Sequence, residues 1–478
     1  MYVHKNLINS LIIGLIFLAT ATELSAVSQT DSDVSAEEEE NNYPFTKSET
    51  EINPKDVVGI RIKKGKVILL SIHNKYSIEK LPDNFSFSSL NFSKQYQKLI
   101  SIEFNGVKLT TEILESLIKS VPLHLKGFVL RRCSIGKENH ELLAYFLEKC
   151  LAISFVNIVL SDLSGEGASR VLHSLRRHRL KYFGYNTCAE ITDEGGDNLA
   201  EVISQSAETL LEVSVGCGNI TADAWQNVTT AISKINKLEK LELAAEALPE
   251  DSLEGTAEFL GDCGKLESLK IFFSLVNRDP AKILALGEGF QRSLKKLSRL
   301  QMLNISDMNF PVEVMHSIAE AIENLKDLKT LDISGNAIDK EAAEIFAKSF
   351  KACHPGILIA NNCKLTAESV TEFCKSFEGS NLKVLCLRGN EIKDGIKNLP
   401  IATMPEIRAI DFSRTGINPD DVMALAKQTN GLENLKFVNL SGNSEIEAMN
   451  SVERIIMMDR LMEDNSNRKG NQISFLGI

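Results

Sequence analysis

The sequence predicts an α/β solenoid of the horseshoe type, with a parallel sheet along a concave face and helices on the outside. Three observations predict it: the apolar pattern LxxLxLxxNxL recurs along the chain, its spacing averages 28 residues, and a helical apolar pattern follows its copies. One such unit cannot bury both its strand and its helix alone. Stacked units share a continuous core, and because a helix is wider than a strand, roughly 10 Å against about 4.8 Å, the stack must curve.

The first 26 residues have the layout of a secretory signal peptide. An apolar run of 11 residues, Leu11 to Ala21, follows a weakly positive start, and Ala19, Ala21 and Ala26 offer cleavage points. This run is too short to span a bilayer, which needs roughly 20 apolar residues. We therefore expect a cleaved signal and a secreted or exported protein, with an uncleaved anchor as the alternative.

Two further segments precede the repeats. Residues 27–50 are acidic, polar and almost free of aliphatic side chains, which predicts a disordered linker. Residues 51–98 are expected to form an N-terminal cap. Within them, residues 57–72 place two β-rich runs around a Lys-Lys-Gly-Lys turn, which predicts a hairpin.

The repeats occupy residues 99–443. The clearest copies begin at Leu328 (LKTLDISGNAI), Leu382 (LKVLCLRGNEI) and Leu435 (LKFVNLSGN). Extending the frame gives thirteen units, and because 336 residues separate the first and last positions, the twelve steps average 28. The third apolar positions of the units are Phe104, Leu130, Ile158, Tyr185, Val215, Leu243, Ile271, Ile305, Ile333, Ala360, Leu387, Phe412 and Leu440.

One step of the repeat is longer than the others. It covers 34 residues, from Ile271 to Ile305, and carries an insertion around residues 277–280. Elsewhere, helix starts are marked by capping residues: Thr192, Thr221, Thr366 and the pair Asn418-Pro419. These side chains accept a hydrogen bond from a free N–H of the first turn, and proline suits the first helical position.

A period of 28 residues with a helical second half resembles the ribonuclease-inhibitor-like class of leucine-rich repeats. The resemblance covers roughly residues 99–446, about three quarters of the chain. It implies the horseshoe fold. It says little about function, because this class includes enzyme inhibitors, Ran GTPase-activating proteins, innate sensors and bacterial effectors.

The Asn of the pattern should face inward, where its amide can bond the backbone of adjacent units. Asn336, Asn390 and Asn443 hold this position in three units. Met308 and Thr415 depart from the pattern, so the sequence alone leaves the register of the middle units open. The resemblance implies that Cys is also tolerated at this position. Cys133, Cys188 and Cys363, which occupy it, are then buried structural thiols, with a disulfide or a reactive thiol as the alternatives.

Two elements are expected after the repeats. Residues 444–463 predict an amphipathic capping helix, with Ile446, Val452, Ile455 and Ile456 available to cover the open end of the core. Residues 464–478 are expected to form a flexible tail.

The strand residues between the core positions should form the concave face. Apolar side chains there indicate an interface, because exposed apolar surface costs solubility. One cluster lies beside Arg131 and a second lies in the carboxyl-terminal half; the alternative is a local frame error that places these side chains in the core. The candidate protein-binding residues are Val129, Arg131, Phe155, Val159, Tyr182, Phe272, Ile357, Ile359, Val384 and Arg388.

The composition narrows the function classes. A net charge of −11 argues against nucleic acid or an anionic membrane as partner, since both need clustered Lys and Arg. Nine cysteines without a CxxC pair predict neither a zinc site nor a disulfide framework. Asn-x-Ser/Thr triplets begin at Asn304 and Asn439 on predicted binding strands, where a glycan would block function. The expected export, the unpaired cysteines and these triplets together favour a bacterial product. No catalytic or cofactor motif is evident, so we expect no enzyme activity and no cofactor.

The leading hypothesis is an exported, monomeric scaffold that binds a protein partner through its concave face. Delivery to a host as an effector is one form of this hypothesis. The alternative is a GTPase-activating protein similar to the Ran activators, in which Arg131, Arg132 or Arg388 supplies positive charge.

Overall fold

The structure, a computed structural model, describes residues 59–63, 66–73, 101–121, 124–163, 165–187, 191–275, 277–393, 395–465 and 473–476. The chain divides into a unit of residues 1–52 and a unit of residues 53–478, and all described elements belong to the second. The predicted signal peptide, the predicted linker and Cys188 lie outside the described residues.

One sixteen-stranded sheet forms the inner layer of the second unit. Strands β1 (Gly59–Lys63) and β2 (Lys66–His73) form the predicted antiparallel hairpin. From β2 onward, each strand of this sheet pairs in parallel with the next one along the chain. The strands that follow are β3 (Ser101–Asn105), β5 (Gly127–Arg131), β7 (Phe155–Val159), β8 (Tyr182–Asn186), β9 (Glu212–Asn219), β10 (Lys240–Ala247), β11 (Ser268–Phe273), β12 (Met302–Asn304), β13 (Thr330–Asp332), β14 (Ile357–Ile359), β15 (Val384–Cys386), β16 (Ala409–Asp411), β17 (Phe437–Asn439) and β18 (Ser474–Leu476). Strands β4 (Lys108–Leu109) and β6 (Ser134–Ile135) form a separate two-stranded ribbon.

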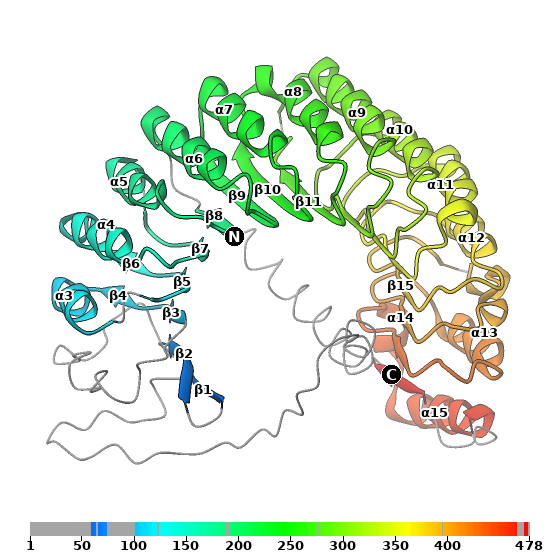
Figure 1. Cartoon of the computed structure of the whole chain (residues 1–478). Coiled ribbons are helices and arrows are strands. Elements are labelled where there is room, and N and C mark those ends of the chain that lie inside the picture. The colour runs from blue at the N-terminus through cyan, green and yellow to red at the C-terminus, as the bar shows by residue number, and fades with distance from the viewer. Residues whose placement is uncertain are drawn as a thin grey trace, which may run out of the picture. The chain divides into compact units, whose positions relative to one another are not determined.

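The helices form the outer layer. They run beside one another along the convex side of the sheet, while the strands line the inner side (Figure 1). Between β15 and β16, short 3₁₀ turns at Ile396–Asn398 and Ile401–Thr403 replace a helix. The helices are α3 (Thr111–Ser120), α4 (His140–Lys149), α5 (Gly165–Leu175), α6 (Asp193–Gln205), α7 (Ala222–Ser233), α8 (Leu253–Glu258), α9 (Pro280–Leu294), α10 (Val312–Ile322), α11 (Lys340–Cys353), α12 (Ala367–Ser376), α13 (Pro419–Thr429), α14 (Ser444–Glu447) and α15 (Ser451–Asn465).

The predicted register holds through the middle of the chain. Leu243 pairs with Val215 on one side and with Ile271 on the other, as the frame requires. All thirteen predicted third apolar positions are buried, with at most 1% of their surface exposed. Stacked residues at one strand position therefore build a continuous hydrophobic core between the sheet and the helices.

The inward-facing Asn residues bond the backbone of the preceding unit. The Asn336 Nδ2 donates to the carbonyl oxygen of Ile305 at 2.9 Å, and its Oδ1 accepts from the N–H of Phe310 at 3.0 Å. Asn390 and Asn443 make equivalent bonds to the carbonyls of the preceding strands, which confirms the predicted role of this position.

Cysteines at the same position are buried thiols. The Cys133 Sγ lies 3.4 Å from the carbonyl oxygen of Phe104, and the Cys363 Sγ lies 3.3 Å from that of Ile333. Burial raises the pKa of the Cys133 thiol to about 11 and that of Cys363 to about 12. Both are free and buried, so the structural interpretation holds for these two residues.

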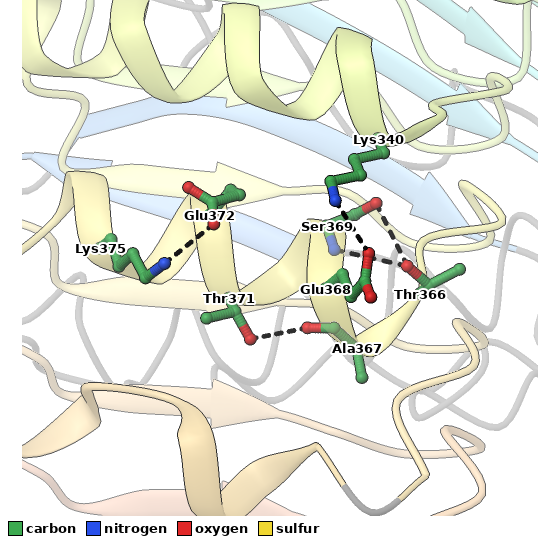
Figure 2. Close-up of polar contacts among 8 residues, drawn as sticks. All are labelled: Lys340, Thr366, Ala367, Glu368, Ser369, Thr371, Glu372 and Lys375. Carbon is green, nitrogen blue, oxygen red and sulfur yellow. Dashed lines mark hydrogen bonds and ion pairs between the residues drawn. The ribbon is translucent and has the colours of Figure 1, made fainter.

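The helices begin where the capping residues predict. Thr192, Thr221 and Thr366 each accept a hydrogen bond from the N–H three residues on. Figure 2 shows the start of α12, where Thr366 accepts from the Ser369 N–H and Lys340 of α11 reaches Glu368. Asn418 forms a full capping box ahead of Pro419 at the start of α13. In the 34-residue step, α9 is 15 residues long and begins at Pro280 after the Asp279 cap, so the insertion lengthens the outer layer.

The carboxyl-terminal predictions need two corrections. The predicted capping helix is two helices, α14 and α15, and only part of it covers the core: Ile446 and Met457 are buried, whereas Val452, Ile455 and Ile456 are 65%, 60% and 47% exposed.

The second correction concerns the predicted flexible tail. Part of the predicted flexible tail, Ser474–Leu476, is strand β18, which pairs in parallel with β17 and extends the sheet beyond the last repeat. The Leu440 N–H donates to the Leu476 carbonyl oxygen at 2.8 Å.

Candidate functional site

The concave face consists of three rows of side chains. In each strand, residues that alternate with the buried core positions point to the opposite side of the sheet. The register aligns these residues between neighbours: Phe155, Tyr182 and Glu212 share the first row, and Val129 and Asn157 share the middle row.

All ten predicted binding residues alternate with core positions, so none of them lies in the layer between sheet and helices. Phe155, Tyr182, Ile357 and Val384 stand in the first row. Val129 and Ile359 stand in the middle row, and Arg131, Val159, Phe272 and Arg388 stand in the third row or its continuation beyond the strand. Val129, Ile359 and Val384 are nevertheless covered by neighbouring side chains, with 5–6% of their surface exposed.

Two aromatic rings form the centre of the amino-terminal cluster. The rings of Phe155 and Tyr182 stack, with centroids 4.2 Å apart and an interplanar angle of 12°. Phe155 is 37% exposed and Tyr182 is half-buried. Burial raises the pKa of the Tyr182 phenol, and the nearby carboxylates of Glu242 and Glu212 raise it further. The phenol therefore stays protonated and can donate a hydrogen bond.

Glycines in the adjacent strands shape this cluster. A Cβ at Gly184 would lie 3.1 Å from the Tyr182 hydroxyl and 2.4 Å from the Asn157 Oδ1, so only glycine leaves room for the tyrosine to lie along its own strand. Gly127 precedes Phe155 in the first row and has no side chain. No first-row side chain of β5 therefore covers the ring of Phe155 on the side away from Tyr182.

The edge of the cluster is partly charged. Arg131 pairs with Glu103 at 3.0 Å between Nε and Oε1, and both lie on the concave face next to Val159. Leu160 follows β7 and is 38% exposed, with a φ of +50°. Sequence reasoning missed Leu160, because a left-handed conformation at a leucine leaves no local signal. We define the aromatic cluster as Phe155, Tyr182, Val159, Leu160 and Arg131.

The middle of the concave face is charged but compensated. Lys240 pairs with Glu212 at 2.6 Å, and Lys270 lies 4.0 Å from Glu242. Each pair joins neighbouring strands. Opposite charges in adjacent strands neutralise each other locally, so this region separates the aromatic cluster from the carboxyl-terminal half without a strong net charge.

An apolar stripe runs along the first row of the carboxyl-terminal half. It consists of Ile357, Val384, Ala409 and Phe437, which are neighbours in the register of β14 to β17. Ile357 and Phe437 are half-buried, and the two between them are buried. The stripe is continuous over four strands, so it adds Ala409 and Phe437 to the predicted binding residues Ile357 and Val384.

A buried carboxyl group lies in the middle row nearby. The Asp332 Oδ1 accepts from the N–H of Ser334 at 3.0 Å, and its Oδ2 accepts from the Asn304 Nδ2 at 3.3 Å. Burial raises the pKa of Asp332 to about 6, and the charge of Asp307 adds to the effect. This carboxyl group changes its charge in a range close to neutral pH.

The arginines of the alternative hypothesis do not converge. Arg131 belongs to β5 and is paired with Glu103, whereas Arg388 follows β15, nine strand spacings away. At about 4.8 Å per strand, this separation is roughly 43 Å along the sheet. They cannot contact one nucleotide together.

A shallow cavity of about 410 Å³ lies at the loops that follow β14 to β16. Lys364, Glu391 and Arg414 line it, so both signs of charge are present. Within the described ranges, His, Cys, Asp and Glu side chains nowhere gather in the groups of three or more that could hold a metal ion. In the same part of the chain, every helix is too short or too polar to cross a bilayer.

A comparison with protein families decides the identity of the repeat. The model described as "Leucine Rich repeat" matches residues 324–347, which contain β13, the core position Ile333, the bonded Asn336 and the start of α11. The chain is a leucine-rich-repeat protein.

Similarity to individual proteins is weaker. The leucine-rich-repeat chain is 29% identical over 295 residues to the NLR family CARD domain-containing protein 4 of Xenopus tropicalis. The match covers 57% of this chain and 28% of the length of that relative. Among solved structures, an internalin (inlF) from Listeria monocytogenes matches with 14% identity and a TM-score of 0.39, covering 74% of this chain and 81% of the internalin. A TLR13–ssRNA13 complex matches with 14% identity and a TM-score of 0.41, covering 79% of this chain and 58% of the TLR13 chain.

Proposed function

We propose that this leucine-rich-repeat protein is an exported, non-catalytic scaffold that binds a protein partner through its concave face. The aromatic cluster makes the main contact. Leucine-rich repeats commonly serve protein interactions, and the fold presents the three rows of side chains as one open surface.

The exposed Phe155–Tyr182 stack is the observation that carries this proposal. Aromatic side chains with Arg are the residue types that contribute most to binding energy when a partner excludes water from them. Here they stand together on a rigid sheet, and Arg131 is held beside them by Glu103. A pre-ordered cluster loses little side-chain entropy on binding.

The outer surface of α11 and α12 is less suited to a partner. Their polar side chains already bond one another, as Figure 2 shows for Lys340 with Glu368 and Lys375 with Glu372. Compared with α11 and α12, the aromatic cluster therefore offers more apolar surface that a partner can bury.

Alanine variants test the concave contact. Phe155→Ala with Tyr182→Ala should abolish recovery of the partner from lysates of candidate host cells, while the melting temperature changes little. The matched control is Tyr145→Ala, because Tyr145 is 45% exposed on α4 of the outer layer. Unchanged recovery by the double variant, or equal loss by the control, would overturn the proposal.

Export is tested separately. The proposed signal peptide predicts that the protein recovered from the culture medium begins at residue 27 or close to it. Protein sequencing of its amino terminus checks this directly. Retention in the cells with an intact amino terminus would contradict the export proposal.

A further inference from the structure

A second row of like side chains borders the apolar stripe. The residues that immediately precede β13 to β17 are Lys329, Gly356, Lys383, Arg408 and Lys436. They are neighbours in space, because each donates its N–H to the carbonyl oxygen of the one before it at 2.7–2.9 Å. Four of the five are basic. We call these four the basic border.

The basic border and the apolar stripe run side by side. Val384, Ala409 and Phe437 of the stripe each directly follow a residue of the basic border. Ile357 follows Gly356, and Lys329 lies one strand beyond it. From Lys329 to Lys436 the border extends over four strand spacings, or roughly 19 Å at about 4.8 Å each. A helix of about 13 residues has the same length at 1.5 Å per residue.

The three lysines of the basic border lack an acidic partner among the described residues. Lys383 and Lys436 form no ion pair there, and the Lys329 Nζ donates only to the side-chain oxygen of Gln301, at 2.8 Å. This contrasts with Lys240 and Lys270, which are matched by glutamates in neighbouring strands.

Acidic residues do occur close by in the sequence. Asp327, Glu406 and Glu433 precede Lys329, Arg408 and Lys436 by two, two and three residues. In the described part of the chain, none of the three acidic residues forms an ion pair with Lys329, Lys383 or Lys436. The three lysines thus form a local basic strip on a chain whose net charge is −11.

We propose that the apolar stripe and the basic border together bind an acidic segment of the partner that carries large apolar side chains. The apolar side chains of that segment cover Ile357 and Phe437, and its carboxylates pair with Lys329, Lys383 and Lys436. This inference rests on the proposed protein-binding role and names the chemistry that the carboxyl-terminal half selects. Charge complementarity supplies the selectivity, and burial of the accessible parts of Ile357 and Phe437 adds to the affinity.

The proposal is tested by selecting peptides that bind the full chain from a phage library of random peptides. The peptides are about 16 residues long, which covers the helical span of roughly 13 residues. The peptides recovered should be rich in Asp and Glu and contain several Leu, Ile or Phe residues. Their binding, measured with synthetic fluorescent copies, should weaken by about tenfold or more in Lys383→Glu with Lys436→Glu. It should also weaken when NaCl is raised from about 50 mM to about 500 mM.

The control variant is Lys348→Glu with Lys427→Glu. It changes the net charge by the same amount at exposed lysines of the outer helices α11 and α13. Peptide binding should survive in this control. Recovery of no peptide, recovery of peptides without acidic residues, or equal binding by both double variants would overturn the proposal.

The aromatic cluster separates this inference from the proposed function. Phe155→Ala with Tyr182→Ala should leave binding of the acidic peptides unchanged, because the cluster and the stripe lie on different strands, β7 and β8 against β14 to β17. If these variants lose the partner while no acidic peptide is selected, only the inference fails. If acidic peptides bind as expected while the aromatic variants recover the partner as well as the wild type does, the inference stands and the proposed contact at the aromatic cluster fails.

Discussion

The Phe155 ring lies parallel to the Tyr182 ring, 4.2 Å away on the adjacent strand. Both rings occupy the first row of the concave face, and the glycines at 127 and 184 give them space. A stacked aromatic pair of this kind presents a rigid apolar surface on the concave face.

The stack itself can be measured. Cross-strand aromatic pairs contribute roughly 0.5–1.5 kcal/mol beyond their buried area. A double-mutant cycle with Phe155→Leu and Tyr182→Leu, followed by urea unfolding, should give a coupling energy in that range. A coupling energy near zero would show that the rings do not hold each other in place.

Gly184 should tolerate no side chain. In Gly184→Ala the new Cβ would approach the Asn157 Oδ1 to 2.4 Å, so Asn157 and the ring of Tyr182 must both shift. We expect a loss of about 1–3 kcal/mol in the free energy of unfolding. Gly255→Ala is the control: Gly255 lies in α8 with no atom near the added Cβ, and it should be neutral or stabilising by up to about 1 kcal/mol. Equal effects at the two sites would refute this account of the cluster.

Asn390 should be one of the most sensitive positions of the chain. Its Oδ1 accepts from the N–H groups of Cys363 and Leu365, and its Nδ2 donates to the carbonyls of Ala360 and Leu387. Asn390→Ala leaves these buried groups without partners, at about 1–3 kcal/mol for each group that stays unsatisfied.

Asn390→Cys should be milder, because Cys363 at the equivalent position contacts two carbonyls. Thermal unfolding of both variants compares them. A cysteine variant that is no more stable than the alanine variant would contradict the shared role of Asn and Cys.

Asp332 should make stability depend on pH. Its pKa is raised from 3.8 to about 6 in the folded protein, so the folded state holds its proton more tightly than the unfolded state. The stability that protonated Asp332 contributes is therefore fully present below the pKa of this carboxyl group in the unfolded chain. It is lost as the pH rises through the folded-state pKa of about 6, and the loss is on the order of 3 kcal/mol.

Asp332→Asn removes this pH-dependent loss and keeps an oxygen that can accept from the Ser334 N–H. At equivalent positions, the Asn304 and Asn439 side chains accept in the same way from the N–H groups of Ser306 and Ser441. Relative to the wild type, the variant should gain stability between about pH 4 and about pH 7, measured by urea unfolding at several pH values. A difference that stays constant with pH would show that this carboxyl group does not titrate as described.

The repeat units were predictable because the clearest units carry two independent signals of their register. The core positions such as Leu243 are fixed by alternation, and Asn336, Asn390 and Asn443 fix the turn that follows the strand. Even where Met308 replaces Asn, its sulfur accepts from the Phe273 N–H and the stack continues. Neighbouring units thus keep the register of a unit that lacks the Asn of the pattern.

Other features depend on contacts between distant segments. Strand β18 is only three residues long, so its sequence carries too little alternation to predict a strand, and it exists because β17 offers an unpaired edge. The basic border joins residues that are about one repeat apart, such as Lys383 and Arg408, and becomes visible only when the strands are aligned.

A photo-crosslinking amino acid placed at Phe155 tests the central claim most directly. The full chain with this substitution is irradiated in contact with candidate host lysates, beside a chain with the same amino acid at Tyr145 of α4. The account predicts a single major protein adduct from position 155 and none from position 145. Adducts only from position 145, or none from either, would contradict a partner on the concave face.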